Sequence, residues 1–67
     1  MELYFNSDLI SLPESATLAD LLLQYALIEK KGIAVAVNGK VISRTFWPDT
    51  YLQANDKIIV IRATQGG

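Results

Sequence analysis

The final residues of the chain carry its most distinctive chemical group. They read RATQGG, Arg62 to Gly67, and place a carboxylate on a glycine. Two glycines make a thin peptide that can adopt backbone angles closed to other residues. Such a peptide could enter a narrow channel and present its carboxylate there. Because a carboxylate is a poor electrophile, acyl chemistry at Gly67 would need activation by another protein. A frayed end without function is the alternative.

Other groups suited to catalysis are scarce. The sequence contains no histidine and no cysteine, so the usual zinc ligands and the common general base and thiol nucleophile are missing. The carboxylates fall in predicted turns, helix caps or helix faces, and none forms an obvious pair. Gly32 and Gly39 are explained by a helix end and a hairpin turn, so no phosphate-binding glycine loop is predicted. We therefore expect no enzyme activity, no catalytic or metal-binding residues, and no bound cofactor.

Composition limits the remaining classes of function. The chain has 67 residues, 51% of them hydrophobic, and a net charge of −1 from six basic and seven acidic residues. No basic stripe indicates nucleic-acid binding, and no apolar run is long enough to cross a membrane. No signal peptide is visible at the start. We expect one cytoplasmic domain over residues 1–67, with 63–67 as a flexible C-terminal tail.

The first half of the chain predicts a hairpin and a helix. Residues 3–5 and 9–12 are apolar segments separated by the turn formers Asn6-Ser7-Asp8. Apolar residues then recur at helical spacing, which predicts a helix over about residues 18–30 and places Leu22 and Tyr25 in the core. Thr17 and Asp20 fit a capping box. Lys30, Lys31 and Gly32 suit the helix C-terminus.

The second half predicts three strands. Asn38-Gly39 lies between two apolar segments and is typical of a type I′ hairpin turn. Residues 44–53 look irregular and include Phe46, Trp47 and Pro48. Asn55-Asp56 then turns the chain into a last strand over residues 57–62.

The last strand raises a question about the two sheet faces. Alternation places Ile58 and Val60 on one side and Ile59 and Ile61 on the other, so the strand looks buried on both. One helix, however, covers one face. The second face is either closed by the Phe46-Trp47 segment or left apolar for a partner, and the sequence leaves both open.

Several motifs in this order resemble a known family. They are TLADLL at the helix start, VNGKVISR at the central hairpin, Trp47 three residues after Arg44, NDKIIVI in the last strand, and the final GG. Together they resemble the ThiS-type sulfur carriers of thiamine biosynthesis, within the ubiquitin-like β-grasp proteins. The family usually has proline and glycine where this chain has Ser43 and Asn55.

The resemblance implies an α+β fold. The expected architecture is a mixed five-stranded β-grasp sheet, in the order ββαβββ, curled round one main helix. Parallel pairing of the first and last strands is also taken from the family, because the pattern along the chain does not give strand order.

The resemblance further implies a protein that carries sulfur for other enzymes. A ThiF-type adenylyltransferase, similar to ubiquitin-activating enzymes, would use MgATP to adenylate the Gly67 carboxylate. A cysteine desulfurase or sulfur relay would then supply sulfur. The resulting thiocarboxylate would donate that sulfur to the thiazole on a ThiG-type thiazole synthase.

Roles for individual residues follow from the same resemblance. Gly67 would be the modified residue, and Thr64, Gln65 and Gly66 would be the tail that enters a partner's channel. Candidates for a partner interface are Ile59, Ile61, Arg44 and Trp47. For Trp47 a core position is the simpler interpretation, and for Arg44 a surface charge.

Three other functions remain open. The small subunit of molybdopterin synthase uses the same chemistry, although that family is usually longer. A ubiquitin-like modifier would be conjugated to lysines of target proteins. A plain interaction module would have an inert tail.

Overall fold

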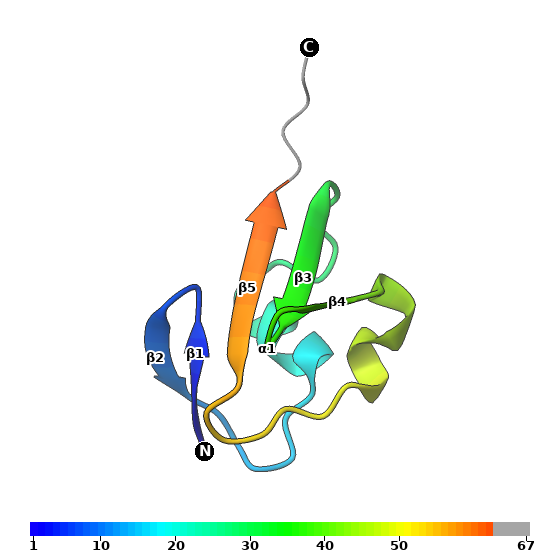
Figure 1. Ribbon diagram of the computed structural model, residues 1–67. Coiled ribbons are helices and arrows are strands. Elements are labelled where there is room, and N and C mark those ends of the chain that lie inside the picture. Colours follow the sequence, from blue (N-terminus) through cyan, green and yellow to red (C-terminus); the bar gives the residue numbers. More distant parts are fainter. Residues whose placement is uncertain (63–67) are drawn as a thin grey trace.

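The architecture is a curved mixed sheet with one helix against one of its faces (Figure 1). The computed structural model describes residues 1–62, and the predicted tail lies outside them. The elements, in chain order, are β1 (Glu2–Phe5), β2 (Asp8–Ser11), α1 (Leu18–Gln24), β3 (Ile33–Val37), β4 (Lys40–Ile42), the 3₁₀ helix η1 (Arg44–Asp49) and β5 (Lys57–Arg62). The strand order across the sheet is β2-β1-β5-β3-β4. The predicted α+β order and mixed five-stranded sheet are confirmed.

Both predicted hairpins form, and each turns on two residues with positive φ. Asn6 and Ser7 have φ of 49° and 75° between β1 and β2, and Asn38 and Gly39 have 53° and 84° between β3 and β4. Two consecutive residues of positive φ match the twist of antiparallel strands. The type I′ turn predicted at Asn38-Gly39 is therefore confirmed.

Asn38 does more than make a turn, which the sequence did not predict. Its side-chain amide donates to Oδ1 of Asp56 at 2.9 Å, and its side-chain oxygen accepts from the backbone N–H of Lys57 at 2.9 Å. These bonds fasten the β3–β4 turn to the beginning of β5. Asn55, which has φ of 71°, turns the chain into β5 at the same place.

β5 lies in the centre of the sheet because it pairs on both sides. It is parallel to β1, with Phe5 opposite Ile58, and antiparallel to β3 from Ile33–Arg62 to Val37–Ile58. The Asn6 side chain extends the first contact by accepting from the backbone N–H of Val60 at 2.9 Å. The parallel pairing of the first and last strands is confirmed.

The core lies between the inner face of the sheet and α1. Its largest fully buried side chains come from β1, α1, β3 and β5 and are Leu3, Leu18, Leu21, Leu22, Val35 and Ile58. The capping box at Thr17 and Asp20 is formed in both directions, so the helix begins where predicted. Leu22 is core, as predicted. Tyr25 is not: it is half-exposed and packs its ring against Phe5, with centroids 4.6 Å apart.

The predicted helix end at residue 30 is wrong. The helix stops at Gln24, because Ala26 adopts a left-handed conformation with φ of 59°. The Ala26 N–H donates to the Leu23 carbonyl at 3.1 Å and the Leu27 N–H to the Leu22 carbonyl at 2.7 Å. This pair of bonds is the Schellman arrangement that ends helices. The apolar residues beyond it continue to pack on the core, which is why their spacing imitated a longer helix.

Lys30, Lys31 and Gly32 therefore do not cap the helix. They lie in the connection between α1 and β3. Gly32 has φ of 75° and turns the chain into β3 instead of ending α1. Left-handed φ is a conformation that glycine adopts without steric cost.

The segment after β4 is more regular than predicted and packs on the helix side of the sheet. Arg44–Asp49 forms η1, which contacts α1. Trp47 is 2% exposed, and its indole N–H donates to the Ile42 carbonyl at 3.0 Å. Its neighbour Phe46 is 59% exposed. Trp47 thus closes the open edge of the core between α1 and β4.

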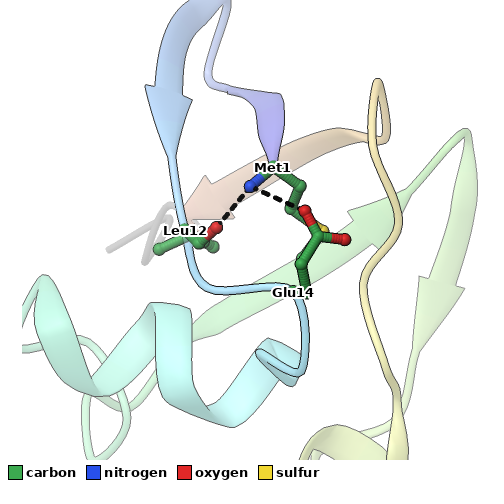
Figure 2. A network of polar contacts seen from close by, with 3 residues as sticks. All are labelled: Met1, Leu12 and Glu14. Atoms are coloured by element: carbon green, nitrogen blue, oxygen red, sulfur yellow. Dashed lines mark hydrogen bonds and ion pairs between the residues drawn. The ribbon is translucent and has the colours of Figure 1, made fainter.

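The amino group of Met1 ties the first strand to the segment after β2 (Figure 2). It donates to the Leu12 carbonyl at 2.6 Å and lies 3.3 Å from a carboxylate oxygen of Glu14. The Leu12 N–H in turn donates to the Met1 carbonyl at 2.9 Å, which extends the hairpin by one residue pair. Glu14 is 87% exposed, so the ion pair adds little to the two backbone bonds.

Replacing Ala26 with glycine should stabilise the protein. The left-handed conformation is unfavourable for alanine and costs glycine nothing sterically, so Ala26→Gly should raise the free energy of unfolding by about 1 kcal/mol. Urea denaturation followed by circular dichroism measures this change. The control is Ala19→Gly inside α1, which should lose about 1 kcal/mol. A loss at both positions would contradict the assigned helix end.

Trp47→Phe should destabilise the protein. The change removes a buried hydrogen bond and leaves the Ile42 carbonyl without its donor, together with a small cavity, at a cost of about 2–3 kcal/mol. The matched control is Phe46→Leu on the exposed neighbour, which should change stability by less than about 0.5 kcal/mol. Thermal unfolding compares the two. Equal effects would show that the core role of Trp47 is wrong.

Candidate functional site

The end of β5 places the last described residue at one end of the sheet. Arg62 pairs with Ile33, the first residue of β3, so the exit of β5 and the entry of β3 lie side by side (Figure 1). We call this end of the sheet the exit end. Four predicted site residues follow it in the chain and lie outside the described residues: Thr64, Gln65, Gly66 and Gly67.

β5 exposes one of its sides, contrary to the expectation of burial on both. Ile58 is fully buried and Val60 partly buried, both toward α1. Ile59 is 39% exposed and Ile61 51% exposed on the opposite side. The alternation predicted from the sequence is confirmed, and its second face is uncovered within residues 1–62.

Neighbouring strands extend this exposed side. The register places Tyr4 opposite Leu9, and both Ile59 and Val41 opposite Ala36. The exposed large apolar side chains on this side form what we call the outer face: Tyr4, Leu9, Val41, Ile59 and Ile61. Exposed apolar residues gathered on one face are typical of an interaction site, whereas scattered ones are normal on any protein surface.

The outer face is uneven as well as apolar. Ala34 and Ala36 on β3 present small side chains beside Ile61 and Ile59. A shallow hollow at the β1–β5 junction is lined by Tyr4, Ser7, Lys57 and Ile59, among others. Such a surface offers ridges and recesses to an apolar partner, with one positive charge at its rim.

The structure answers which alternative holds for the second face. The segment containing Phe46 and Trp47 packs against α1, not across the outer side of the sheet. Closure by that segment is therefore wrong, and the alternative of an uncovered apolar face is confirmed for the part of the chain that the structure describes.

Arg44 is held by its own chain. Its guanidinium donates to the carbonyls of Ile28 and Lys30, each at 2.7 Å, and lies over the Trp47 ring with 4.5 Å to the centroid. Two carbonyls and an aromatic face suit a planar cation with several donors. Arg44 thus clamps the α1–β3 connection to η1, which is more than the surface charge expected.

Trp47 is placed in the core. With 2% of its surface exposed, its ring has no area to offer to another protein. Of the four residues predicted for an interface, Ile59 and Ile61 share the outer face, whereas Arg44 and Trp47 form a separate structural contact. Sequence reasoning missed Tyr4, Leu9 and Val41, although the same period-two alternation marks them.

Among residues 1–62, no three histidine, cysteine, aspartate or glutamate side chains are grouped so that they could hold a metal ion. In the same range, no helix is long and apolar enough to cross a membrane.

Two departures from the family pattern fit the backbone. Ser43 has φ of −61° and ψ of 142°, which are angles that proline adopts. Asn55 has positive φ, where glycine is favoured and asparagine tolerated. Each residue therefore keeps the conformation that the usual family residue would take.

Solved structures with a similar fold include two from Geobacter metallireducens. The crystal structure of the thiamine biosynthesis protein ThiS has 23% identity and a TM-score of 0.85, with 100% of both chains covered. The solution structure of a thiamine biosynthesis protein has 23% identity and a TM-score of 0.75, covering 100% of this chain and 88% of the other. SAMP1 from Haloferax volcanii has 17% identity and a TM-score of 0.63, covering 98% and 97%. These likenesses show the ubiquitin-like β-grasp fold.

The family to which the chain belongs is shown by a match of its sequence to a family model. No curated protein matches the chain. The model of the ThiS family, however, matches residues 1–67, the whole of the sequence. The protein, whose central strand ends at the edge of an uncovered apolar face, therefore belongs to the ThiS family of ubiquitin-like β-grasp proteins.

Proposed function

We propose that this protein is a sulfur carrier for thiazole formation in thiamine biosynthesis and that Gly67 carries the sulfur. The observation that supports this most directly is the match to the ThiS family over residues 1–67, which includes the final glycines. The described fold is compatible with it, because β5 delivers the chain to the exit end beside an apolar surface.

The first step would be activation of the Gly67 carboxylate. One carboxylate oxygen attacks the α-phosphorus of MgATP on an adenylyltransferase and displaces pyrophosphate. The product is an acyl-adenylate, in which the carbonyl carbon has a good leaving group. MgATP is bound by the partner, and this chain supplies only the nucleophilic oxygen.

The second step would exchange oxygen for sulfur. The terminal sulfur of a partner's cysteine persulfide attacks the acyl carbon and displaces AMP. A second thiol then cleaves the sulfur–sulfur bond, leaving a thiocarboxylate on Gly67 and a disulfide on the partner. When this sulfur passes to the thiazole precursor on a thiazole synthase, the acyl carbon takes up an oxygen from the precursor or from water in its place, and the carboxylate is regenerated. All catalytic groups belong to the partners, so the chain acts as a co-substrate and not as an enzyme.

The outer face would be the surface on which these partners dock. It carries five exposed apolar side chains, and β5 contributes Ile59 and Ile61 directly before the tail. Docking there would direct residues 63–67 into the partner's active site. Binding energy from the globular part would thus position the reacting end, which has little side-chain surface of its own.

Adenylation and sulfur transfer should be visible in the mass of the intact protein. After incubation with MgATP, an adenylyltransferase of the ubiquitin-activating type and a persulfide donor, we expect one oxygen to be replaced by sulfur. Intact-mass spectrometry before and after alkylation of the product detects it.

Deletion of Gly67 is the control for that reaction. The shortened chain should fold normally and remain unmodified, because its end no longer reaches the partner's nucleotide. Covalent attachment of the intact chain to other proteins in a cell extract would instead indicate a ubiquitin-like modifier and overturn the proposal.

The outer face should govern recognition by the adenylyltransferase. Ile59→Gln with Ile61→Gln should lower kcat/KM for adenylation about tenfold or more, since central apolar contacts dominate most protein interfaces. The matched control is Leu23→Gln, which changes an aliphatic residue on α1 that is 65% exposed. Leu23→Gln should leave adenylation unchanged. Equal kcat/KM for all three proteins would exclude docking through this face.

A further inference from the structure

The net charge of −1 conceals a strong separation of charge along the molecule. Four of the six basic residues gather near the exit end, with Glu29 as the only acidic residue among them. The rest of the described chain has two basic residues and six acidic ones. We call the four basic residues the basic cluster: Lys30, Lys31, Arg44 and Arg62. The exit end is thus positive and the remainder negative.

The fold, not the sequence, assembles the basic cluster. Arg62 ends β5 opposite Ile33, and Lys30 and Lys31 precede β3 in the chain, with Gly32 between Lys31 and the strand. Arg44 comes from η1 and reaches the same connection, with its guanidinium 2.7 Å from the Lys30 carbonyl. Three segments that are far apart in sequence therefore bring their charges to one place.

The α1–β3 connection that carries the two lysines is held in position. Arg44 bonds the carbonyls of both Ile28 and Lys30, and the Lys30 N–H donates to Leu27 at 3.1 Å. Because Arg44 donates only to neutral carbonyls here, its charge is not cancelled. A fixed loop loses less conformational entropy on binding than a mobile one.

The basic cluster is exposed to solvent and forms no ion pair within the described chain. All four residues are exposed, and no ion pair involving them occurs among residues 1–62, where the contact between Met1 and Glu14 is the one ion pair present. Charges left without partners around one feature produce a local potential that attracts the opposite sign. In this protein the unpaired charges surround the end of β5, from which residues 63–67 continue.

The nucleotide of an adenylation site is too far away to be the ligand. Five residues in an extended channel would span about 17 Å at ~3.3–3.6 Å per residue. With Gly67 at the nucleotide, the basic cluster would lie at the mouth of the channel and not at the phosphates. The groups that face it there belong to the surface of the partner protein.

We propose that the basic cluster binds an acidic protein surface at the rim of the adenylating partner's channel. The inference rests on the proposed function and adds a second contact to it. The outer face supplies apolar burial, whereas the cluster steers the exit end toward the channel and sets the rate of encounter. Electrostatic steering of this kind raises association rates by about 10-fold to 1,000-fold and weakens as salt increases.

Charge reversal tests the proposal. Lys30→Glu with Lys31→Glu should lower the association rate with the adenylyltransferase about tenfold at ~0.03 M salt, and the difference should shrink toward ~0.3 M. Stopped-flow fluorescence measures the rate. The maximal rate of adenylation at saturating carrier should stay within about twofold, because neither lysine reaches the reacting atoms.

Two single substitutions distinguish an effect of the basic cluster from an effect of net charge. Lys31→Glu and Lys40→Glu alter the total charge equally, but Lys40 begins β4 at the other end of β3. We expect slower association for Lys31→Glu and no change for Lys40→Glu. Equal slowing by both would show a general charge effect, and no slowing by either would remove the role of the cluster. In both cases the proposed function would still hold as long as the unaltered chain is adenylated. If the unaltered chain is not adenylated, both proposals are overturned.

Two further measurements test the class of ligand and the part that Arg44 plays. Addition of MgATP alone should not shift the amide resonances of residues 30, 31 and 62, and a shift would overturn the proposal in favour of a phosphate ligand. Arg44→Lys keeps the charge but loses the two-carbonyl clamp. It should slow association less than Lys30→Glu with Lys31→Glu, while raising hydrogen exchange in the 28–31 segment. Unchanged exchange there would show that Arg44 does not position the lysines.

Discussion

A single helix can cover only one face of a five-stranded sheet, and the rest of this structure depends on that limit. α1 and η1 pack on the same side, where Trp47 completes the core, so the small hydrophobic interior is closed without help from the other face. The outer face therefore remains free while the fold stays complete. The core and the exposed apolar surface lie on opposite sides of the same strands, and β5 contributes to both because its residues alternate between them.

The central place of β5 links the core to the exit end. Its fully buried Ile58 anchors the strand beside β1 and β3, whereas the last residues of the strand pair only with β3. Asparagine side chains reinforce the anchored half: Asn38 holds Lys57 and Asn6 holds Val60. A rigid strand origin defines where the following segment starts, which matters for any reaction at a distant terminal group.

The two proposed contacts differ in physical character and in what they can decide. Apolar burial on the outer face would set how long a complex lasts, because dissociation must expose that surface again. The basic cluster sets how quickly and in which orientation the complex forms. A carrier that must leave each enzyme after one reaction benefits from an encounter accelerated by charge and a contact area of modest size. The near-neutral net charge hides this arrangement because six of the seven acidic residues lie elsewhere.

Local spacing and turn chemistry were enough to predict the strands, the helix start, the turn at Asn38-Gly39 and the alternation in β5. The sequence also indicated the family through motifs spread over the chain. It misplaced the helix end, because a left-handed alanine at residue 26 has no sequence signal and the apolar spacing continues past it. The core position preferred for Trp47 is confirmed, but the packing of its segment against α1, the bare outer face and the meeting of Arg44 with Lys30, Lys31 and Arg62 at one end became clear only from the three-dimensional packing. Those facts depend on which side of the sheet a segment packs, and packing across the fold is not encoded in local periodicity.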